Sequence, residues 1–263
     1  MPRSATAAID VGTGVAIGAA GPRSRYYLED NFNKVPMLSA SYNLNGNFDD
    51  EEAEAAIEAN HNWETGGTGT EVVAASTGGG VSLTTGANDE DQAYLLPNTS
   101  SLLDVAWDTV QWSTDKRPSL QWVFSTGANV SDCTICAGFF LAHDAPYAVS
   151  GDADRIWFEY VAGDGTNGNK VVAITSIGGT DREQPLTIEL EVSTAYWCKI
   201  DVTEDRTADM FFGKVSDPGS ANHVRTDALT TAITALKPTI MVESGAAATK
   251  TITAHHCAIG RDL

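Results

Sequence analysis

The sequence predicts an all-β protein, an antiparallel sandwich of two sheets in a jelly-roll arrangement. Three observations lead to this fold class: short apolar runs alternate with polar residues, glycine-rich turns separate these runs, and strong helix-forming stretches are few. The chain has 263 residues, of which 42% are hydrophobic, so it is long enough to bury a core as one large domain.

The N-terminal segment, residues 1–28, is rich in small residues and poor in large apolar ones. Such a segment has too little apolar surface for a core of its own, so we expect an extended arm held by the domain or by another subunit. Residues 29–263 then form the sandwich as one domain. Asp10 and three glycines interrupt the apolar middle of the arm, which argues against a signal peptide.

Residues 48–60, "FDDEEAEAAIEAN", are the one clear helical candidate. Asp49 or Asp50 can cap the helix, and its acidic first turn suits the helix dipole. Ile57 and the alanines provide only a thin apolar face, so we expect a short surface helix that covers an edge of the sandwich.

From Glu71 onwards, apolar runs and turns follow one another as strands and loops do. The clearest alternation is "LTIELEV", where Leu186, Ile188, Leu190 and Val192 should point inward and the glutamates outward. The expected strands cover residues 71–76, 81–86, 119–127, 132–142, 155–161, 170–179, 186–192, 196–202, 209–215, 237–244 and 250–260.

Several stretches, taken in order, carry a resemblance to known proteins: "NDEDQAYLLP", "VQWSTDKRPSLQWVFSTGANVSDCTICAGFFLA", "DADRIWFEY", "SIGGTD", "AYWCKIDVTEDRTADMFFGKV" and "ALKPTIMVESGAAATKTITAHHCAIGRDL". Together they resemble the concanavalin A/laminin-G-like sandwich, and within it the structural proteins of tailed phages, particularly those of marine hosts. The resemblance covers about residues 30–261 and implies a non-enzymatic component of a virus particle.

The charge of the chain excludes two classes of partner. It carries 35 acidic and 16 basic residues, a net charge of −19, which repels nucleic acid and anionic lipid surfaces. No stretch approaches the roughly 18 consecutive apolar residues of a membrane span. With the resemblance, this favours a capsid decoration or cement protein on the outer capsid surface of a virion. Its partners would be the major capsid protein and copies of itself, as a dimer or trimer.

The cysteines raise the question of chemistry. Cys133 and Cys136 lie three apart in a continuous apolar run, so on a strand their side chains point to opposite faces. A zinc or redox pair needs converging sulfurs, and we therefore interpret both as small apolar strand residues. Two alternatives stay open. The first is a zinc site that combines residues 133–136 with His255 and Cys257, which should share one face of the last strand on either side of His256. The second is a disulfide between two of the four cysteines, although Cys198 should face the core.

Carboxylates provide the second possible chemistry. Sandwich-type glycoside hydrolases need two or three acidic residues converging on a cleft, and Glu189 and Glu191 are the nearest match. The alternation of their strand points both to solvent. We therefore expect no enzyme, and a glycoside hydrolase of the same fold is only the third hypothesis.

The second hypothesis is a carbohydrate-binding module, either a host-attachment protein or a lectin. Trp63 and Trp112 lie near expected loops and are the candidate sugar platforms. Calcium, which often binds at the rims of lectin and laminin-G-like sandwiches, is the one cofactor considered. Its candidate ligands lie in or beside acidic turns: Asp89, Asp91, Asp152 and Asp154.

Overall fold

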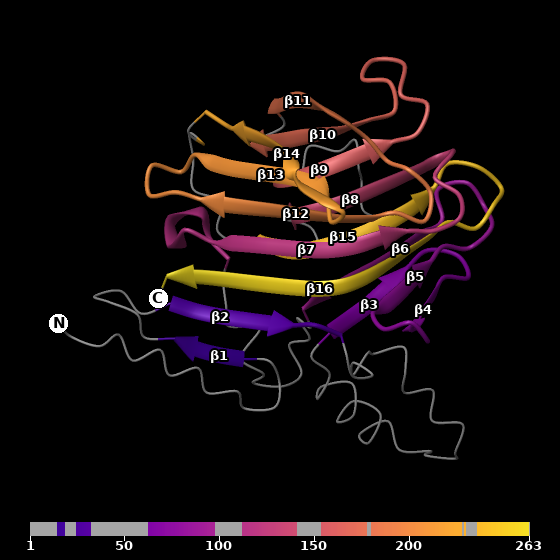
Figure 1. Ribbon diagram of the computed structural model, residues 1–263, viewed down its shortest axis with the longest axis horizontal. Coiled ribbons are helices and arrows are strands. Elements are labelled where there is room, and N and C mark those ends of the chain that lie inside the picture. The colour runs from indigo at the N-terminus through magenta and orange to yellow at the C-terminus, as the bar shows by residue number, and fades with distance from the viewer. Residues whose placement is uncertain are drawn as a thin grey trace, which may run out of the picture.

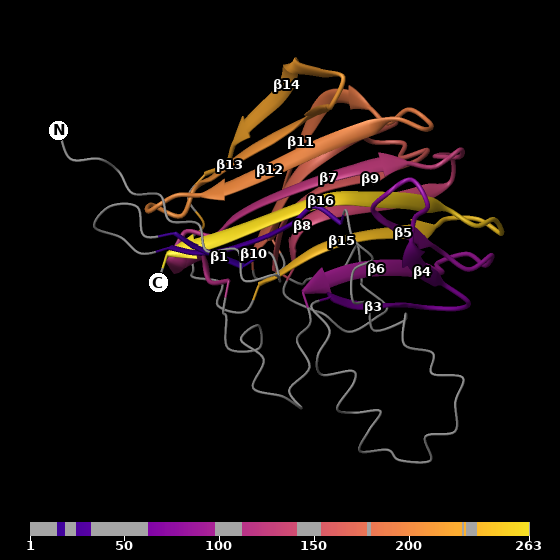
Figure 2. The ribbon, with the colours of Figure 1, turned by 60° about the horizontal axis from the view of Figure 1, so that its bottom comes forward.

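The computed structural model describes residues 15–18, 25–32, 63–97, 112–140, 154–177, 180–227, 229 and 236–262. Within these ranges the chain forms two antiparallel sheets packed face to face, as Figures 1 and 2 show, so the predicted all-β sandwich is confirmed. The helix expected at residues 48–60 lies outside the described residues. No helix in the described part of the chain has the length and hydrophobicity needed to cross a membrane.

One sheet has nine strands and brings the two ends of the described chain together. The C-terminal strand β16 pairs with β7 along most of its length, and with β2 and β5 on its other side. The strands, in sheet order, are β1 (Val15–Gly18), β2 (Arg25–Asp30), β16 (Thr251–Asp262), β7 (Ser119–Thr126), β12 (Ala195–Val202), β13 (Ala208–Lys214) and β14 (Asp217–Arg225), with β5 (Val81–Thr84) beside β16 and β4 (Val72–Ala75) beside β5.

The other sheet has seven strands, and strands distant in sequence pair at its centre. Strand β15, which comes near the C-terminal end of the sequence, lies between β8 and β6 in the sheet. Its neighbours in the sheet are therefore not its neighbours in the sequence. The strands, in sheet order, are β11 (Thr180–Glu189), β10 (Lys170–Ile177), β9 (Arg155–Val161), β8 (Cys133–Phe140), β15 (Lys237–Ser244), β6 (Gln92–Pro97) and β3 (Trp63–Gly67).

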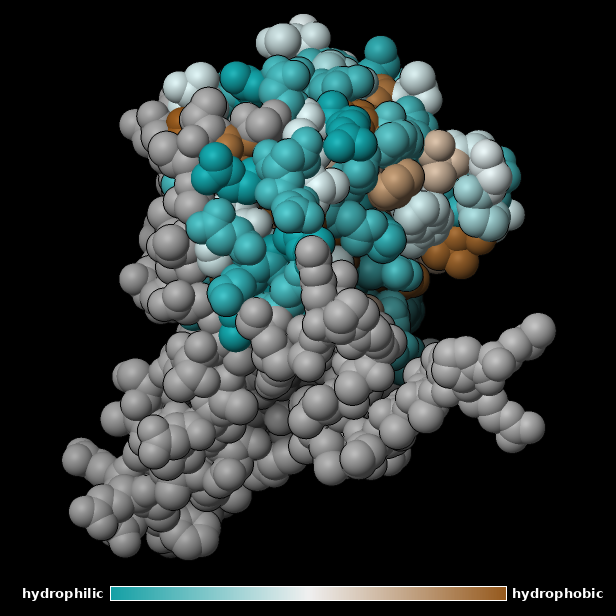
Figure 3. All heavy atoms as spheres, turned by 90° about the vertical axis from the view of Figure 1, so that its left-hand side faces the viewer, coloured by the Kyte–Doolittle hydropathy of each residue, from teal (hydrophilic) through white to brown (hydrophobic). Residues whose placement is uncertain are grey.

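The main core fills the space between the sheets. On β7 every second residue is buried, so Leu120, Trp122 and Phe124 point into the main core. Phe212 of β13 lies 6.3 Å from Phe124 and 5.2 Å from Phe158 of β9, measured between ring centroids, so aromatic rings join the two sheets. On the side of the molecule in Figure 3, most coloured residues are hydrophilic, in keeping with the acidic composition.

A second apolar cluster lies on the outer face of the seven-stranded sheet. All eight residues of β8 are buried, because this sheet carries apolar side chains on both faces. The cluster consists of Tyr94, Leu96, Cys136, Phe140, Trp157, Val172, Ile174 and Met241. Trp157 stacks on Phe140 with ring centroids 4.8 Å apart, and the cluster thus forms a packed layer opposite the main core.

The boundary predicted between arm and sandwich falls inside a strand. Strand β2, Arg25–Asp30, crosses from residue 28 to 29 and pairs with β16 from Cys257 to Asp262. Strand β1, Val15–Gly18, adds to the outer side of β2. These parts of the segment 1–28 extend the nine-stranded sheet, and an extended arm stays a prediction for the residues outside the described ranges.

The cysteines are packing residues. Cys133 faces the main core and Cys136 the outer cluster, which confirms their predicted opposite directions. All four cysteines are buried and free. Cys198 and Cys257 both lie opposite Trp122, one on each side of β7, so their α-carbons are about 10 Å apart, beyond the span of a disulfide.

The alternative zinc site is not formed. Residues 133–136 lie in the seven-stranded sheet, whereas β16, which carries His255, lies in the nine-stranded one. A bulge between Ala254 and His256 also shifts the register of β16 against β7. As a result, Cys257 points into the core. His255 lies on the outer face, where its Nε2 is 2.9 Å from Oγ of Ser125. The expectation that His255 and Cys257 share a face was therefore wrong.

Candidate functional site

A hollow of about 220 Å³ lies on the outer face of the seven-stranded sheet. Strands β9, β10 and β11 form its floor, and the loop between β9 and β10 forms its rim. Below, this hollow is called the outer groove. It is lined by Glu159, Val161, Asp164, Thr166, Asn167, Val172, Ile174 and Glu183.

The register of the strands explains why these side chains meet. Directly paired residues on neighbouring strands project to the same face of a sheet. Val172 lies opposite Glu159, and Ile174 lies opposite both Trp157 and Glu183, so all of these belong to the outer face. One such row crosses the whole sheet: Gly66, Tyr94, Met241, Cys136, Glu159, Val172 and Pro185.

The rim is a loop whose shape is set by its own polar groups. Asp164 accepts hydrogen bonds from the backbone amides of Thr166, at 2.8 Å, and Asn167, at 3.3 Å. These bonds lower the pKa of Asp164, the largest cause being the Thr166 amide. The Nδ2 of Asn167 donates to Oε2 of Glu183 at 3.3 Å, which ties the loop to β11. The rim therefore presents fixed carboxylate and amide groups above an apolar floor.

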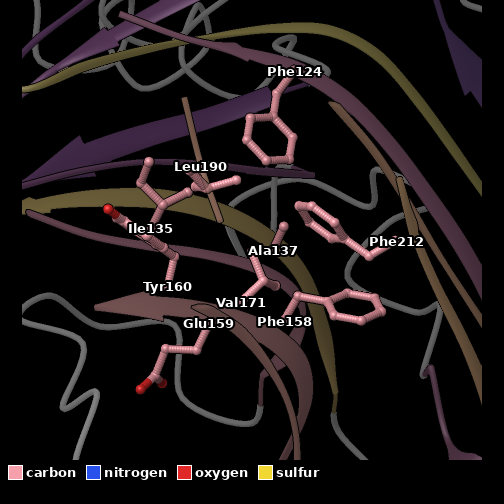
Figure 4. A pocket seen from close by; sticks show the side chains of 9 residues that line it. All are labelled: Phe124, Ile135, Ala137, Phe158, Glu159, Tyr160, Val171, Leu190 and Phe212. Atoms are coloured by element: carbon pink, nitrogen blue, oxygen red, sulfur yellow. The ribbon is translucent and has the colours of Figure 1, made fainter. Parts of the chain in front are cut away.

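Glu159 is half-buried at the floor of the groove. Figure 4 shows its side chain turned away from the core residues around Phe158, toward the other face of β9. Its Oε2 is buried, and the donor beside the carboxylate is the side chain of Trp157. Burial raises the pKa of Glu159 from its ordinary 4.5 to about 7, and Glu183 and Asp181 add to this rise. Arg155 and a hydrogen bond from the Trp157 side chain oppose it.

The raised pKa makes the stability of the protein depend on pH at this residue. Because the fold disfavours the charged form, wild-type protein should lose stability as pH rises from about 4.5 through 7. We expect Glu159→Gln to be more stable than wild type at pH 8 by up to about 3 kcal/mol, and equal to it at pH 4.5. Urea unfolding of both proteins across this range measures the difference. Parallel curves at every pH would contradict the assignment, and the exposed Glu204→Gln serves as control.

Neither tryptophan proposed as a sugar platform is exposed. Trp63 is 1% and Trp112 is 2% exposed, and both belong to the main core. The Nε1 of Trp63 donates to Oδ2 of Asp30 at 2.9 Å, and its ring packs against Phe32 and Trp122. The prediction that these two tryptophans form exposed surfaces for sugar binding was wrong. A position near a loop in the sequence does not prevent a large aromatic ring from being buried beneath that loop.

Of the three described acidic residues considered for calcium, Asp154 lies far from the other two. Asp91 lies at the Ser244 end of β15, whereas Asp154 precedes β9 at the Lys237 end, roughly 20 Å away along the strand. Asp89 is exposed, and Asp152 lies outside the described residues. No group of three metal-ligating side chains that could hold an ion occurs in the described part of the chain.

Asp91 itself has a structural role. Its Oδ2 accepts hydrogen bonds from the backbone amide of Asn88, at 2.8 Å, and from the Asn88 side chain, at 3.1 Å. Its carboxylate is packed so tightly against Gly69 and Gly86 that a β-carbon at either glycine would lie less than 2.5 Å from it. Asp91 therefore holds the turn before β6.

Glu189 and Glu191 point to solvent, as the alternation predicted. Leu186 and Leu190 are buried, but Val192 is 51% exposed, contrary to prediction, because β11 ends at Glu189 and the chain turns at Ser193 with a φ of 50°. The nearest glycosidase-like pair is therefore exposed on the surface.

The lining residues of the outer groove were missed by the sequence reasoning, although two signals were present. The run "GDGTNGN" has the composition of an open, oxygen-rich turn, and it supplies Asp164, Thr166 and Asn167. In "RIWFEYV" the inward positions of Ile156, Phe158 and Tyr160 left Glu159 on the outer face. Nothing in the sequence paired these two stretches with β11.

Comparisons with known proteins identify the fold of this chain but no protein family. No protein-family model matches the chain, and no curated protein matches it in sequence. Solved structures do match. Peanut lectin, determined with a nine-residue peptide, aligns over 90% of this chain and 97% of its own, with a TM-score of 0.56 and 10% identity. The chain has a concanavalin-like lectin fold.

Two further matches show the same sandwich. A protein of unknown function from Shewanella oneidensis MR-1 covers 93% of this chain and 90% of its own, with a TM-score of 0.56 and 11% identity. The exoplasmic/lumenal domain of VIP36, bound to Ca²⁺ and Man3GlcNAc, covers 76% and 83%, with a TM-score of 0.53 and 9% identity. Identities this low show the fold alone, and these matches provide no link to tailed phages.

Proposed function

We propose that the protein is a carbohydrate-binding module and that its ligand lies in the outer groove. The observation that carries this proposal is the composition of the groove, an apolar floor beneath a rim of carboxylate and amide groups. A sugar ring has the matching chemistry, because its C–H faces pack on apolar surface and its hydroxyls donate to carboxylates and accept from amides.

The fold supports the same conclusion. Several matched structures are lectins or carbohydrate-recognition domains, including the UEA-II lectin complexed with galactose. We infer binding without hydrolysis, in line with those lectins. The alternative hypothesis drawn from the sequence, a lectin-like module, is thus better supported than its leading one.

The proposal is tested by glycan screening of the full chain, followed by calorimetry with the best ligand. Replacing both Asn167 and Glu183 with alanine removes hydrogen-bonding groups from two sides of the groove, and we expect affinity to fall about tenfold or more. Glu204→Ala, at an exposed turn of the other sheet, should bind like wild type. Failure of every glycan class to bind, or wild-type affinity in the double variant, would refute the proposal.

A role as capsid decoration protein stays a prediction. It rests on the resemblance to phage structural proteins, and so do the location on the outer capsid surface and the partnership with a major capsid protein. The dimer or trimer expected from the sequence is equally untested, and light scattering after size exclusion of the full chain would measure it.

A further inference from the structure

We propose that Asn167, on the rim of the outer groove, is a site of spontaneous deamidation in the folded protein, which converts its side-chain amide to a carboxylate. The modification itself needs no ligand. Its consequence for binding rests on the proposed carbohydrate-binding function, because Asn167 supplies an amide group of the rim. The proposal is carried by the sequence of the loop between β9 and β10 and by the open space around Gly168.

The reaction is an intramolecular substitution between neighbouring residues. The backbone nitrogen of Gly168 loses its proton and attacks the side-chain carbonyl carbon of Asn167. The bond from that carbon to Nδ2 breaks, the leaving nitrogen takes up the proton, and ammonia departs from a five-membered succinimide ring. Water then opens the ring, giving aspartate or isoaspartate according to which of the two carbonyl carbons it attacks. One water enters and one ammonia leaves, so the reaction needs no further reactant.

The residue after Asn167 favours this attack. Glycine has no side chain to obstruct the approach of its backbone nitrogen, and a β-carbon built at Gly168 would meet no atom within 4 Å. The φ of Gly168 is 66°, in the region that glycine adopts with the least strain. Gly168 is exposed and Asn167 is half-buried. Among the residues that the structure describes, Asn167 is the one asparagine that precedes a glycine.

The bonds that the attack must break are local. An isolated antiparallel bridge joins Asp164 to Gly168, and Nδ2 of Asn167 donates to Oε2 of Glu183 at 3.3 Å. The backbone has to rotate at Asn167 for the nitrogen to reach the side-chain carbon, so this bridge must open. The loop begins where β9 ends, at the surface. Its opening is therefore a local fluctuation that does not require β9 and β10 to separate.

The same loop contains a second pair that could form a succinimide, Asp164 and Gly165. An ionised carboxylate resists attack by a nucleophile because of its negative charge, whereas the amide of Asn167 is neutral. The hydrogen bond from the backbone amide of Thr166 lowers the pKa of Asp164, which keeps this carboxylate ionised at neutral pH. Asn167 is therefore the reactive position of the loop.

Deamidation changes the contact between the rim and β11. The Nδ2 of Asn167 donates to Glu183, but an ionised aspartate at this position has no donor and carries the same charge as its partner. Isoaspartate in addition inserts a methylene group into the backbone of the loop. The groove then carries a fourth carboxylate beside Glu159, Asp164 and Glu183, and it has lost an amide that could donate to a sugar hydroxyl. We expect the rim to separate from β11 and sugar affinity to fall.

The test is peptide mapping by mass spectrometry after the full chain has been kept at pH 8 and 37 °C. A sample unfolded in urea gives the rate at which the unconstrained sequence reacts. We expect folded protein to convert Asn167 at no less than about one tenth of that rate, because surface loops open at little cost in free energy. Mapping separates this product from any at Asn45, the other asparagine before a glycine. The described asparagines without a following glycine should stay unchanged, among them Asn129, Asn169 and Asn222.

Two glycine variants test the reaction path. Gly168→Ala places a methyl group beside the attacking nitrogen and should slow the conversion at least about tenfold. Gly165→Ala alters the same loop but keeps the reactive pair, so it should react like wild type. A loosened loop would speed the attack, so a slower reaction of Gly168→Ala does not come from damage to the fold. Equal rates in all three proteins overturn the proposal, and so does folded wild type that stays unmodified while the urea sample reacts.

The consequence for binding is measured with Asn167→Asp, which carries the deamidated side chain from the start. With the best ligand from the glycan screen, we expect its affinity to be at least about fivefold below that of wild type. Asn169→Asp is the matched control. It adds the same charge to the same loop and keeps the oxygen that accepts from the Gly163 amide, but Asn169 does not line the groove.

The outcomes distinguish this inference from the function on which part of it rests. Wild-type affinity in Asn167→Asp overturns the consequence for binding. If no glycan binds to any of the proteins while mapping detects the product at Asn167, the proposed function fails and the modification site is supported. If glycans bind but Asn167 stays an asparagine in the folded protein, the modification site fails and the carbohydrate-binding module remains.

Discussion

Replacing Gly138 with alanine should lower the free energy of unfolding by about 3 kcal/mol. Gly138 lies in the middle of β8, where the backbone of β9 approaches closely. A β-carbon at this position would lie 2.5 Å from the carbonyl oxygen of Ile156 and 2.5 Å from Cα of Trp157. Backbone atoms of a central strand cannot move aside as a flexible side chain can, so the two strands would have to separate.

Equilibrium unfolding in urea measures this change, and Gly165→Ala provides the matched control. Gly165 lies in the rim loop, and a β-carbon there would meet no atom within 4 Å. We expect the control to change the unfolding free energy by less than about 0.5 kcal/mol. If both variants were equally stable, β8 and β9 would not approach each other at Gly138 as described.

The second large effect is expected for Trp63→Ala, which should cost about 3–5 kcal/mol of unfolding free energy. The indole of Trp63 is fully enclosed between Phe32 and Trp122, and its loss leaves a cavity at one edge of the main core. The substitution also removes the indole N–H that donates a hydrogen bond to Asp30. Among the described residues, the Asp30 carboxylate then keeps the hydrogen bond from the backbone amide of Phe32.

Val72→Ala is the control for Trp63→Ala, because Val72 is a large apolar residue that is 58% exposed on strand β4. It should be nearly neutral. Glycan affinity measured on the folded fraction of Trp63→Ala should equal that of wild type, since the ring reaches no surface. Normal stability with lost glycan binding would restore the tryptophan to the role of sugar platform.

The comparison between sequence and structure is clearest in individual strands. Alternation in "SLQWVFST" puts Leu120, Trp122 and Phe124 on one face of a strand, and the structure shows that this face of β7 lies in the core. The run "CTICAGFF" carries no such alternation, and both faces of β8 are buried. From the sequence, the spacing of Cys133 and Cys136 still gave their opposite directions, since that depends only on the two-residue period of a strand.

Local sequence by itself determined the all-β class, the positions of most strands from β4 onward and the inward or outward direction of many side chains, because these follow from short-range periodicity. Tertiary structure alone decided which strands are neighbours. It paired β9, β10 and β11 in the register that joins Glu159, the rim loop and Glu183 in one groove, and it separated Asp91 from Asp154. It also buried Trp63 and Trp112, because burial depends on segments far apart in the chain.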